Sequence, residues 1–83
     1  MKEVIFQRKA LKQLRKIPIG AQIRAKCDEL AYFPFCQNVK SLVNYKYPYR
    51  FRVGDYRVFF EIIGETMNVV SIEEVKKRDE RTY

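Results

Sequence analysis

Three arginines in the second half of the chain alternate with apolar and aromatic residues. In the segment YPYRFRVGDYRVFFEI, Arg50 and Arg52 precede a glycine–aspartate pair and Arg57 follows it. Side chains alternate between the two faces of a strand, so the three guanidinium groups share the face opposite the apolar side chains. Arginine presents a planar fork of donors that matches phosphate oxygens. The spacing therefore predicts a phosphate-binding surface on one face of a small sheet.

The expected strand register brings two of these charges together. A two-residue loop at Gly54-Asp55 joins the strands and pairs Arg52 directly with Arg57. Like charges directly opposite each other destabilise a sheet by up to about 1 kcal/mol. A sheet selected for stability alone would carry a different residue at one of these positions.

The strand that follows has two possible registers. A three-residue loop at 64–66 buries Val70 and Ile72 and sets Glu73 opposite Arg57, whereas a two-residue loop turns the strand over. We favour the first register because it buries two β-branched residues.

A second interpretation of these charges is a solvated sheet face on which Glu61 and Glu73 act as counterions. Lys76, Lys77 and Arg78 come directly after the last expected strand and add cations to the same face. This accumulation favours the phosphate-binding interpretation.

The rest of the chain supplies the elements that position this face. The apolar pattern predicts strands at 2–6, 45–53, 56–63 and 67–75, helices at 7–17 and 21–32, and a loop at 35–43. The order β-α-α-β-β-β predicts a single α+β domain over residues 1–83, in which a helical hairpin packs on one face of an antiparallel sheet.

The composition narrows the classes of function. The formal net charge is +7, and residues 1–43 hold nine Lys and Arg against three acids. Such a basic chain suits a nucleic acid, a membrane surface or an acidic partner. No apolar run reaches the ~18 residues of a membrane span, and the N-terminus has no secretory signal, so we expect a cytoplasmic protein.

The residue types that bind metals are scarce. The chain has no histidine and two cysteines, Cys27 and Cys36, which lack the paired spacing of a zinc site. We expect two reduced thiols, no metal and no cofactor. The lack of histidine also removes the commonest general base.

Over nearly its whole length the chain resembles the RelE branch of the RelE/ParE toxin superfamily, the toxic halves of bacterial type II toxin–antitoxin pairs. The resemblance lies in ALKQLRKI of the first helix, in YRFRVGDYRV at residues 49–58, and in KRD at residues 77–79 followed by Tyr83. It implies the RelE/ParE-like, microbial RNase-like fold.

The resemblance also implies an activity. RelE toxins cut messenger RNA in the ribosomal A site without a metal, by attack of the 2′-hydroxyl on the neighbouring phosphate. By this resemblance the residues that act on the phosphate are Arg50, Arg52, Arg57, Arg78 and Tyr83. RelE itself has lysines at the first two positions. Because arginine is not readily deprotonated, Glu73, Tyr83 or a solvent molecule would take the 2′-hydroxyl proton.

Two other functions share parts of this pattern. A ParE-like toxin has the same fold and inhibits DNA gyrase, and a nonenzymatic RNA-binding domain would use the same surface. The full basic set with Tyr83 favours the endoribonuclease. The implied partners are an acidic antitoxin and the ribosome with its mRNA and 16S rRNA, with no membrane and no small-molecule substrate. Further basic residues form either a solubilising face or an RNA-binding surface: Lys9, Lys12, Lys16, Lys40, Lys46 and Lys77.

Overall fold

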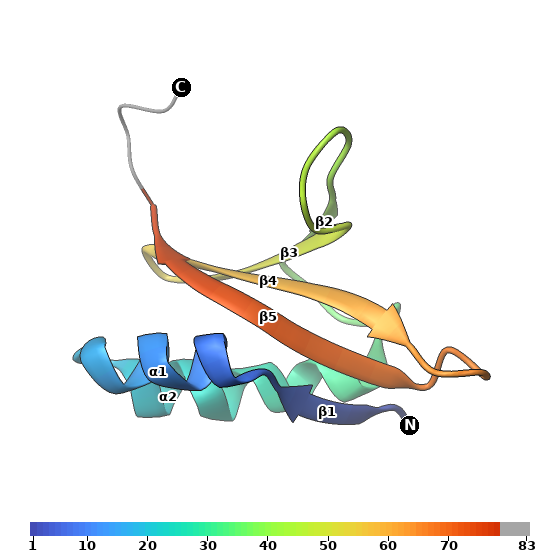
Figure 1. Cartoon of the computed structure of the whole chain (residues 1–83), viewed down its shortest axis with the longest axis horizontal. Coiled ribbons are helices and arrows are strands. Elements are labelled where there is room, and N and C mark those ends of the chain that lie inside the picture. Colours follow the sequence, from blue (N-terminus) through green and yellow to red (C-terminus); the bar gives the residue numbers. More distant parts are fainter. Residues whose placement is uncertain (79–83) are drawn as a thin grey trace.

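A five-stranded mixed sheet carries the helices on one of its faces (Figure 1). The computed structural model describes residues 1–78. Its elements are β1 (Glu3–Phe6), α1 (Arg8–Lys16), α2 (Gly20–Lys26), the 3-10 helix η1 (Cys27–Tyr32), β2 (Val39–Ser41), β3 (Tyr49–Val53), β4 (Tyr56–Ile63) and β5 (Val69–Lys77). The strand order is β1-β5-β4-β3-β2. The α+β architecture expected from the sequence is confirmed.

Two features of the sheet differ from the sequence-based expectation. The sheet is mixed, because β1 runs parallel to β5 while the other neighbours are antiparallel. No hairpin links the first strand to the last, so nothing local in the sequence fixes their relative direction. Residues 39–41, expected in a loop, form β2 and pair with β3. A strand of three residues is too short to show a clear alternation.

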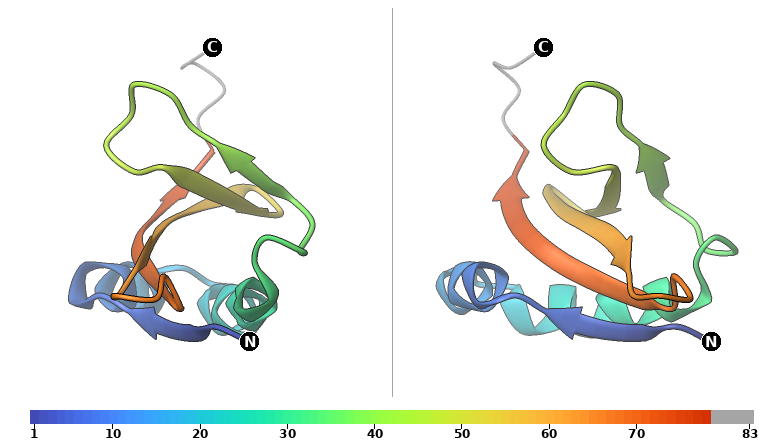
Figure 2. Two further views of the ribbon diagram at one scale, coloured as in Figure 1. Left: turned by 90° about the vertical axis from the view of Figure 1, so that its right-hand side faces the viewer. Right: turned by 45° about the vertical axis from the view of Figure 1, so that its right-hand side comes forward.

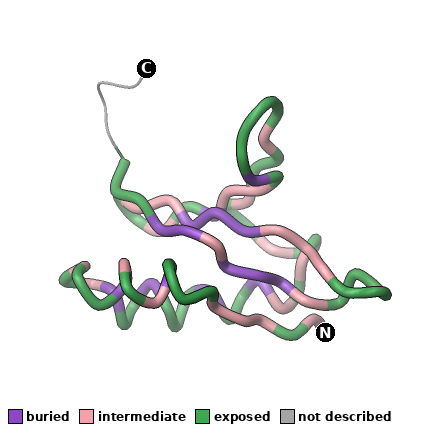
Figure 3. The backbone as a smooth tube through the Cα atoms, viewed as in Figure 1, coloured by how far each residue is buried: buried purple, intermediate pink, exposed green. Residues whose placement is uncertain are grey.

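The hydrophobic core lies between the helices and the sheet (Figure 3). Its buried members are Ala10, Leu14, Ile23, Cys27 and Leu30 from the helices, and Phe51, Val58, Phe60, Val70, Ile72 and Val75 from the strands. Gly20 lets α2 begin close to α1, because a Cβ at this position would clash with the carbonyl oxygen of Leu14. Both cysteines are free thiols, and burial raises the pKa of Cys27 to about 12, with a smaller contribution from nearby carboxylates.

A β-bulge in β5 changes the register between the two longest strands. Phe60 pairs with Ile72, but the preceding residue, Phe59, pairs with Glu74. Glu73 is therefore the extra residue on the bulged strand. In addition, five residues (64–68) separate the paired ends of β4 and β5, rather than the three expected.

Because of the longer loop and the bulge, one expectation about the site is wrong. Val70 and Ile72 are buried as predicted, but Glu73 does not lie opposite Arg57. Lys76 takes that place. Because the bulge adds one residue, the side chains beyond it exchange faces, which keeps Val75 in the core and turns its neighbours outward.

The loop between β2 and β3 (residues 42–48) stands on the side of the sheet away from the helices (Figures 1 and 2). It replaces the first part of the strand predicted at 45–53. The N–H of Leu42 donates a hydrogen bond of 2.8 Å to the carbonyl of Pro48 and closes the loop. Beneath it, Tyr47 and Phe59 are only 8% and 4% exposed. The outer face of the sheet is thus partly covered, rather than open to solvent.

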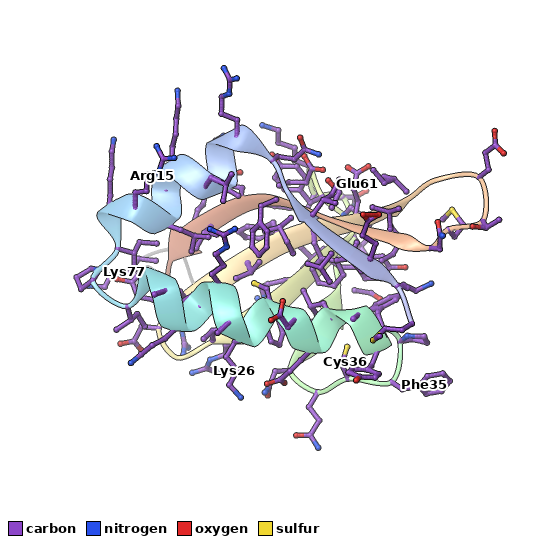
Figure 4. The ribbon with its side chains drawn as sticks, turned by 90° about the horizontal axis from the view of Figure 1, so that it is seen from below. Arg15, Lys26, Phe35, Cys36, Glu61 and Lys77 are labelled. Carbon is purple, nitrogen blue, oxygen red and sulfur yellow. The ribbon has the colours of Figure 1, made fainter. Side chains whose placement is uncertain are left out.

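The helical side of the molecule is shown in Figure 4, in which Arg15 and Lys26 lie on the helical layer and Phe35 points away from the body of the protein. Along residues 1–78, no helix is long and apolar enough to cross a membrane.

Candidate functional site

Cations from four strands lie side by side on the outer face of the sheet. Arg52 pairs with Arg57, as predicted, and Arg57 has Lys76 on its other side. Two residues before Arg52 on β3, Arg50 pairs with Lys40 of β2. Neighbouring like charges oppose sheet formation. This arrangement is what an anion-binding surface requires, and it is not favoured by strand pairing alone.

These cations surround two hollows. The smaller, of about 180 Å³, is lined by Lys40, Arg50, Arg52, Gly54, Tyr56, Arg57 and Arg78. The larger, of about 620 Å³, is lined by Leu42, Val43, Tyr45, Arg50, Arg57, Phe59, Lys76 and Lys77. Arg50 and Arg57 line both hollows and therefore stand at the boundary between them. Among the described residues, no carboxylate lines either hollow.

The β3–β4 turn holds the end of β5 beside this boundary. Gly54 adopts a φ of +58°, which glycine tolerates better than other residues in a tight hairpin loop. The N–H of Arg78 donates a 2.6 Å hydrogen bond to the carbonyl of Asp55 in this turn. On the other side, Nε of Arg52 donates to the carbonyl of Gly54 at 3.3 Å. Backbone contacts therefore bring Arg78 close to the arginines of β3 and β4.

The pKa of Arg57 shows the effect of burial and of the neighbouring positive charges. Its side chain is half-buried between neighbouring strands. Burial lowers the pKa of Arg57, and the charges of Arg50, Arg78 and Arg52 lower it further. Each effect disfavours the cationic form in the folded protein. A bound anion would offset this repulsion, so the site is arranged to attract one.

A buried carboxylate lies at the edge of the same face. Glu74 is 5% exposed, and its Oε1 lies 3.1 Å from Nζ of Lys9 and 3.7 Å from Nζ of Lys76. Burial raises the pKa of Glu74, but the hydrogen bond from Lys9 and the charges of Lys76 and Lys46 outweigh it, and the net pKa is lowered. Glu74 therefore stays ionised and ties α1 to the outer face.

The sequence interpretation did not identify Glu74. The signal was present in the spacing of the apolar residues, because Val70 and Ile72 are two apart whereas Val75 follows after three. Such a change in the spacing of apolar residues indicates a bulge. Beyond the bulge the alternation is shifted by one residue, so Glu74 lies on the outer face. The side-chain carbonyl of Gln13 on α1 accepts a 2.6 Å hydrogen bond from the N–H of Val75 and satisfies the strand at this point.

The aromatic residues of the outer face were also missed. The ring of Tyr45 stacks on Phe59, with centroids 5.1 Å apart, and Tyr47 lies 5.9 Å from the same ring. From the sequence, Tyr45 belonged to a strand. The run of tyrosines before Pro48 was the available indication that this segment covers apolar surface.

The structure brings together most of the predicted site residues but not all of them. Arg50, Arg52, Arg57, Arg78 and Lys40 line the smaller hollow, and Lys77 lines the larger. Tyr83 lies outside the described residues. Glu73 lines neither hollow; its carboxylate accepts a 2.6 Å hydrogen bond from Oγ of Ser71, which in turn accepts one from the side chain of Gln7.

The other predicted RNA-binding lysines lie elsewhere. Lys9, Lys12 and Lys16 line a separate hollow of about 330 Å³ along α1. Nζ of Lys46 lies 5.4 Å from the ring centroid of Tyr47, on the loop above the sheet. Within residues 1–78, no three Cys, Asp or Glu side chains gather closely enough to hold a metal ion.

Comparison with known proteins connects this geometry to a family. The family model described as the ParE toxin of the type II toxin–antitoxin system parDE matches residues 4–82. No protein of curated function matches the sequence.

Solved structures show the same fold. The archaeal RelE–RelB complex from Pyrococcus horikoshii OT3 has a TM-score of 0.74 at 26% identity, with 95% of this chain and 97% of the other covered. The intact E. coli RelBE toxin–antitoxin complex has a TM-score of 0.71 at 24% identity, with 96% and 100% covered. The isolated E. coli RelE toxin has a TM-score of 0.73 at 23% identity, with 96% and 87% covered.

The family match covers almost the entire chain, and it confirms the membership that the sequence motifs implied. The chain belongs to the ParE toxin family of type II toxin–antitoxin systems, within the RelE/ParE superfamily whose fold it shares.

Proposed function

We propose that this toxin is a ribosome-dependent endoribonuclease that cuts messenger RNA in the A site and so inhibits translation. The observation that carries the proposal is the arrangement of Arg50, Arg52, Arg57 and Arg78 around one small hollow. Four arginines that line one small hollow suit a phosphate whose negative charge increases during the reaction.

The chemistry requires charge stabilisation more than it requires a special side chain. The 2′-oxygen of the RNA forms a bond to the adjacent phosphorus as the bond to the 5′-oxygen breaks. The products are a 2′,3′-cyclic phosphate and a 5′-hydroxyl, the latter formed when the leaving oxygen takes a proton. Arg57 lies between two other cations, because Arg52 of β3 and Lys76 of β5 pair with it on its two sides. Its donors would bind the phosphate oxygens as the pentavalent state forms.

Proton transfer remains the demanding step. Among the described residues, the lining of the smaller hollow contains no carboxylate, and the chain contains no histidine. A solvent molecule held by the ordered substrate, or Tyr83, would take the 2′-hydroxyl proton. Without an efficient base, most of the rate must come from positioning of the RNA, which the ribosome would provide.

A second candidate function is inhibition of DNA gyrase. The description of the matching family model, a ParE toxin, favours it. The same preparation therefore has to be tested on both targets.

The deciding experiment uses ribosomes programmed with a defined mRNA, with a known codon in an empty A site. We expect cleavage within that codon, a 2′,3′-cyclic phosphate at the new end, and no comparable cleavage of the same mRNA without ribosomes. A gyrase supercoiling assay with the same protein should show no inhibition. Gyrase inhibition together with intact ribosome-bound mRNA would replace the nuclease with the gyrase function.

A further inference from the structure

The larger hollow on the outer face has two chemically different walls. One wall is formed by apolar side chains of the loop and of β4: Leu42, Val43, Tyr45 and Phe59. The other wall is cationic and consists of Arg50, Arg57, Lys76 and Lys77. Its volume of about 620 Å³ is within the range of small-ligand sites, about 300–1,000 Å³. The walls suit a ligand that is flat and apolar at one end and anionic at the other.

The aromatic part of the apolar wall is held in place by ring contacts. Tyr45 stacks on Phe59 with an angle of 26° between the rings, and the buried Tyr47 supports both. The hydrogen bond from Leu42 to Pro48 closes the base of the loop. Despite this support, 47% of Tyr45 and 84% of Val43 remain exposed. The loop therefore presents a supported apolar surface beside a row of cations.

The cationic wall connects this surface to the phosphate-binding hollow. Arg50 and Arg57 line both hollows, so a ligand could place one group in each and pass between them over these two arginines. A single strand of RNA has this form, because flat bases alternate along it with phosphates. Aromatic side chains beside a basic track are the usual means by which proteins bind such strands.

We propose that the larger hollow is a nucleobase subsite, in which one unstacked base of single-stranded RNA packs against Tyr45 while its phosphate lies on Arg50 and Arg57. The identification of the strand as RNA rests on the proposed function. The lining side chains offer donors on the cationic side and a single hydroxyl on Tyr45. Stacking therefore contributes most of the binding, and the subsite favours purines over pyrimidines because purines stack over a larger area.

Direct binding tests the subsite separately from catalysis. Two 2′-O-methyl pentamers, which cannot undergo 2′-hydroxyl attack, carry equal numbers of phosphates: one is abasic throughout and the other bears a single central adenine. We expect fluorescence anisotropy to show about tenfold tighter binding of the adenine-bearing strand, which corresponds to about 1.4 kcal/mol for the one stacked base.

Three variants identify the source of that preference. Tyr45→Ala should remove the tenfold difference and leave the affinity for the abasic strand unchanged, whereas Tyr45→Phe should keep the difference. Tyr32→Ala is the matched control, because Tyr32 is 60% exposed on η1 and lines neither hollow. Thermal unfolding verifies that each protein is folded.

The outcomes separate this inference from the proposed function. Equal binding of the two strands by the parent, or an adenine preference that survives Tyr45→Ala, overturns the subsite even if ribosome-bound mRNA is cut. A Tyr45→Ala variant that loses affinity for an acidic peptide but not for adenine assigns the hollow to a protein partner instead. A Tyr45-dependent adenine preference without mRNA cleavage upholds the subsite and rejects the nuclease.

Discussion

Two basic surfaces of this toxin are built in different ways. On α1, cations such as Lys12 and Lys16 are exposed and border a shallow hollow along one helix. On the outer face of the sheet, arginines from neighbouring strands are paired directly, as Arg52 is with Arg57. The helix can extend its charges into solvent, whereas strand pairing holds those of the sheet side by side.

The difference indicates which surface is shaped for a specific ligand. Exposed lysines attract any polyanion over a distance and are screened by salt. Arginines on paired strands start from fixed backbone positions, and the neighbouring positive charges at Arg57 are a cost that an anion offsets. We therefore expect the sheet to govern the rate of cleavage and the helix to govern only the strength of association.

Arg57→Ala should reduce activity more than any other substitution considered below. Removal of one preorganised donor should lower ribosome-dependent cleavage by about 10²–10³-fold. Arg57→Lys keeps the charge but loses the fork, so it should recover only a small part of the rate. Single-turnover cleavage and thermal unfolding are measured on the same preparations, with Arg15→Ala on α1 as the control. A folded Arg57→Ala protein that cuts at the parental rate would remove Arg57 from the site.

Glu74→Gln tests the contact that joins the two surfaces. Loss of the charge that pairs with Lys9 and Lys76 should lower the free energy of unfolding by about 1–2 kcal/mol at pH 7, because the carboxylate is buried while Lys9 is half-exposed. This corresponds to a decrease in Tm of roughly 4–16 °C for a domain of this size. Glu29→Gln, which removes the exposed pair with Lys26, should change the stability much less.

The dependence on pH distinguishes the charge of Glu74 from its packing. The pKa of Glu74 is lower in the folded protein than in the unfolded chain, so its ionisation stabilises the fold above the ordinary glutamate pKa. That contribution is lost as the pH falls through the lowered value. The difference in Tm between parent and Glu74→Gln should thus be full at pH 6–7 and shrink below about pH 4.3. A constant difference down to pH 3 would indicate packing alone.

The smallest effect is expected on α1. The double variant Lys12→Ala, Lys16→Ala should reduce cleavage only a few-fold at low salt, through KM rather than kcat, and the loss should vanish as the salt concentration is raised. The Arg57→Ala defect should persist at high salt. Titration of KM and kcat against KCl makes this comparison. A loss in kcat that salt does not relieve would place the helix lysines in the catalytic machinery and end the distinction between the two surfaces.

The features of the molecule that depend on local periodicity could be predicted from the amino-acid sequence. The two-residue loop and the alternation of side chains fix the pairing of Arg52 with Arg57, and the structure has that pairing. Ile23, Cys27 and Leu30 are spaced at i, i+4 and i+7 within the helix predicted at 21–32, and all three are buried. These features depend on neighbours a few residues apart, so the sequence pattern is sufficient for them.

The other groups that lie beside the arginines could not be predicted, because they depend on contacts between distant segments of the chain. The contact of Lys9 with Glu74, the hydrogen bond from Val75 to Gln13, and the parallel pairing of β1 with β5 connect segments distant in the sequence. These contacts form together, because each depends on the packing of the helices and β1 against β5. The five residues between β4 and β5 and the bulge replace Glu73 by Lys76 beside Arg57. A shift of one or two residues changes few local preferences, but it changes every partner across the sheet.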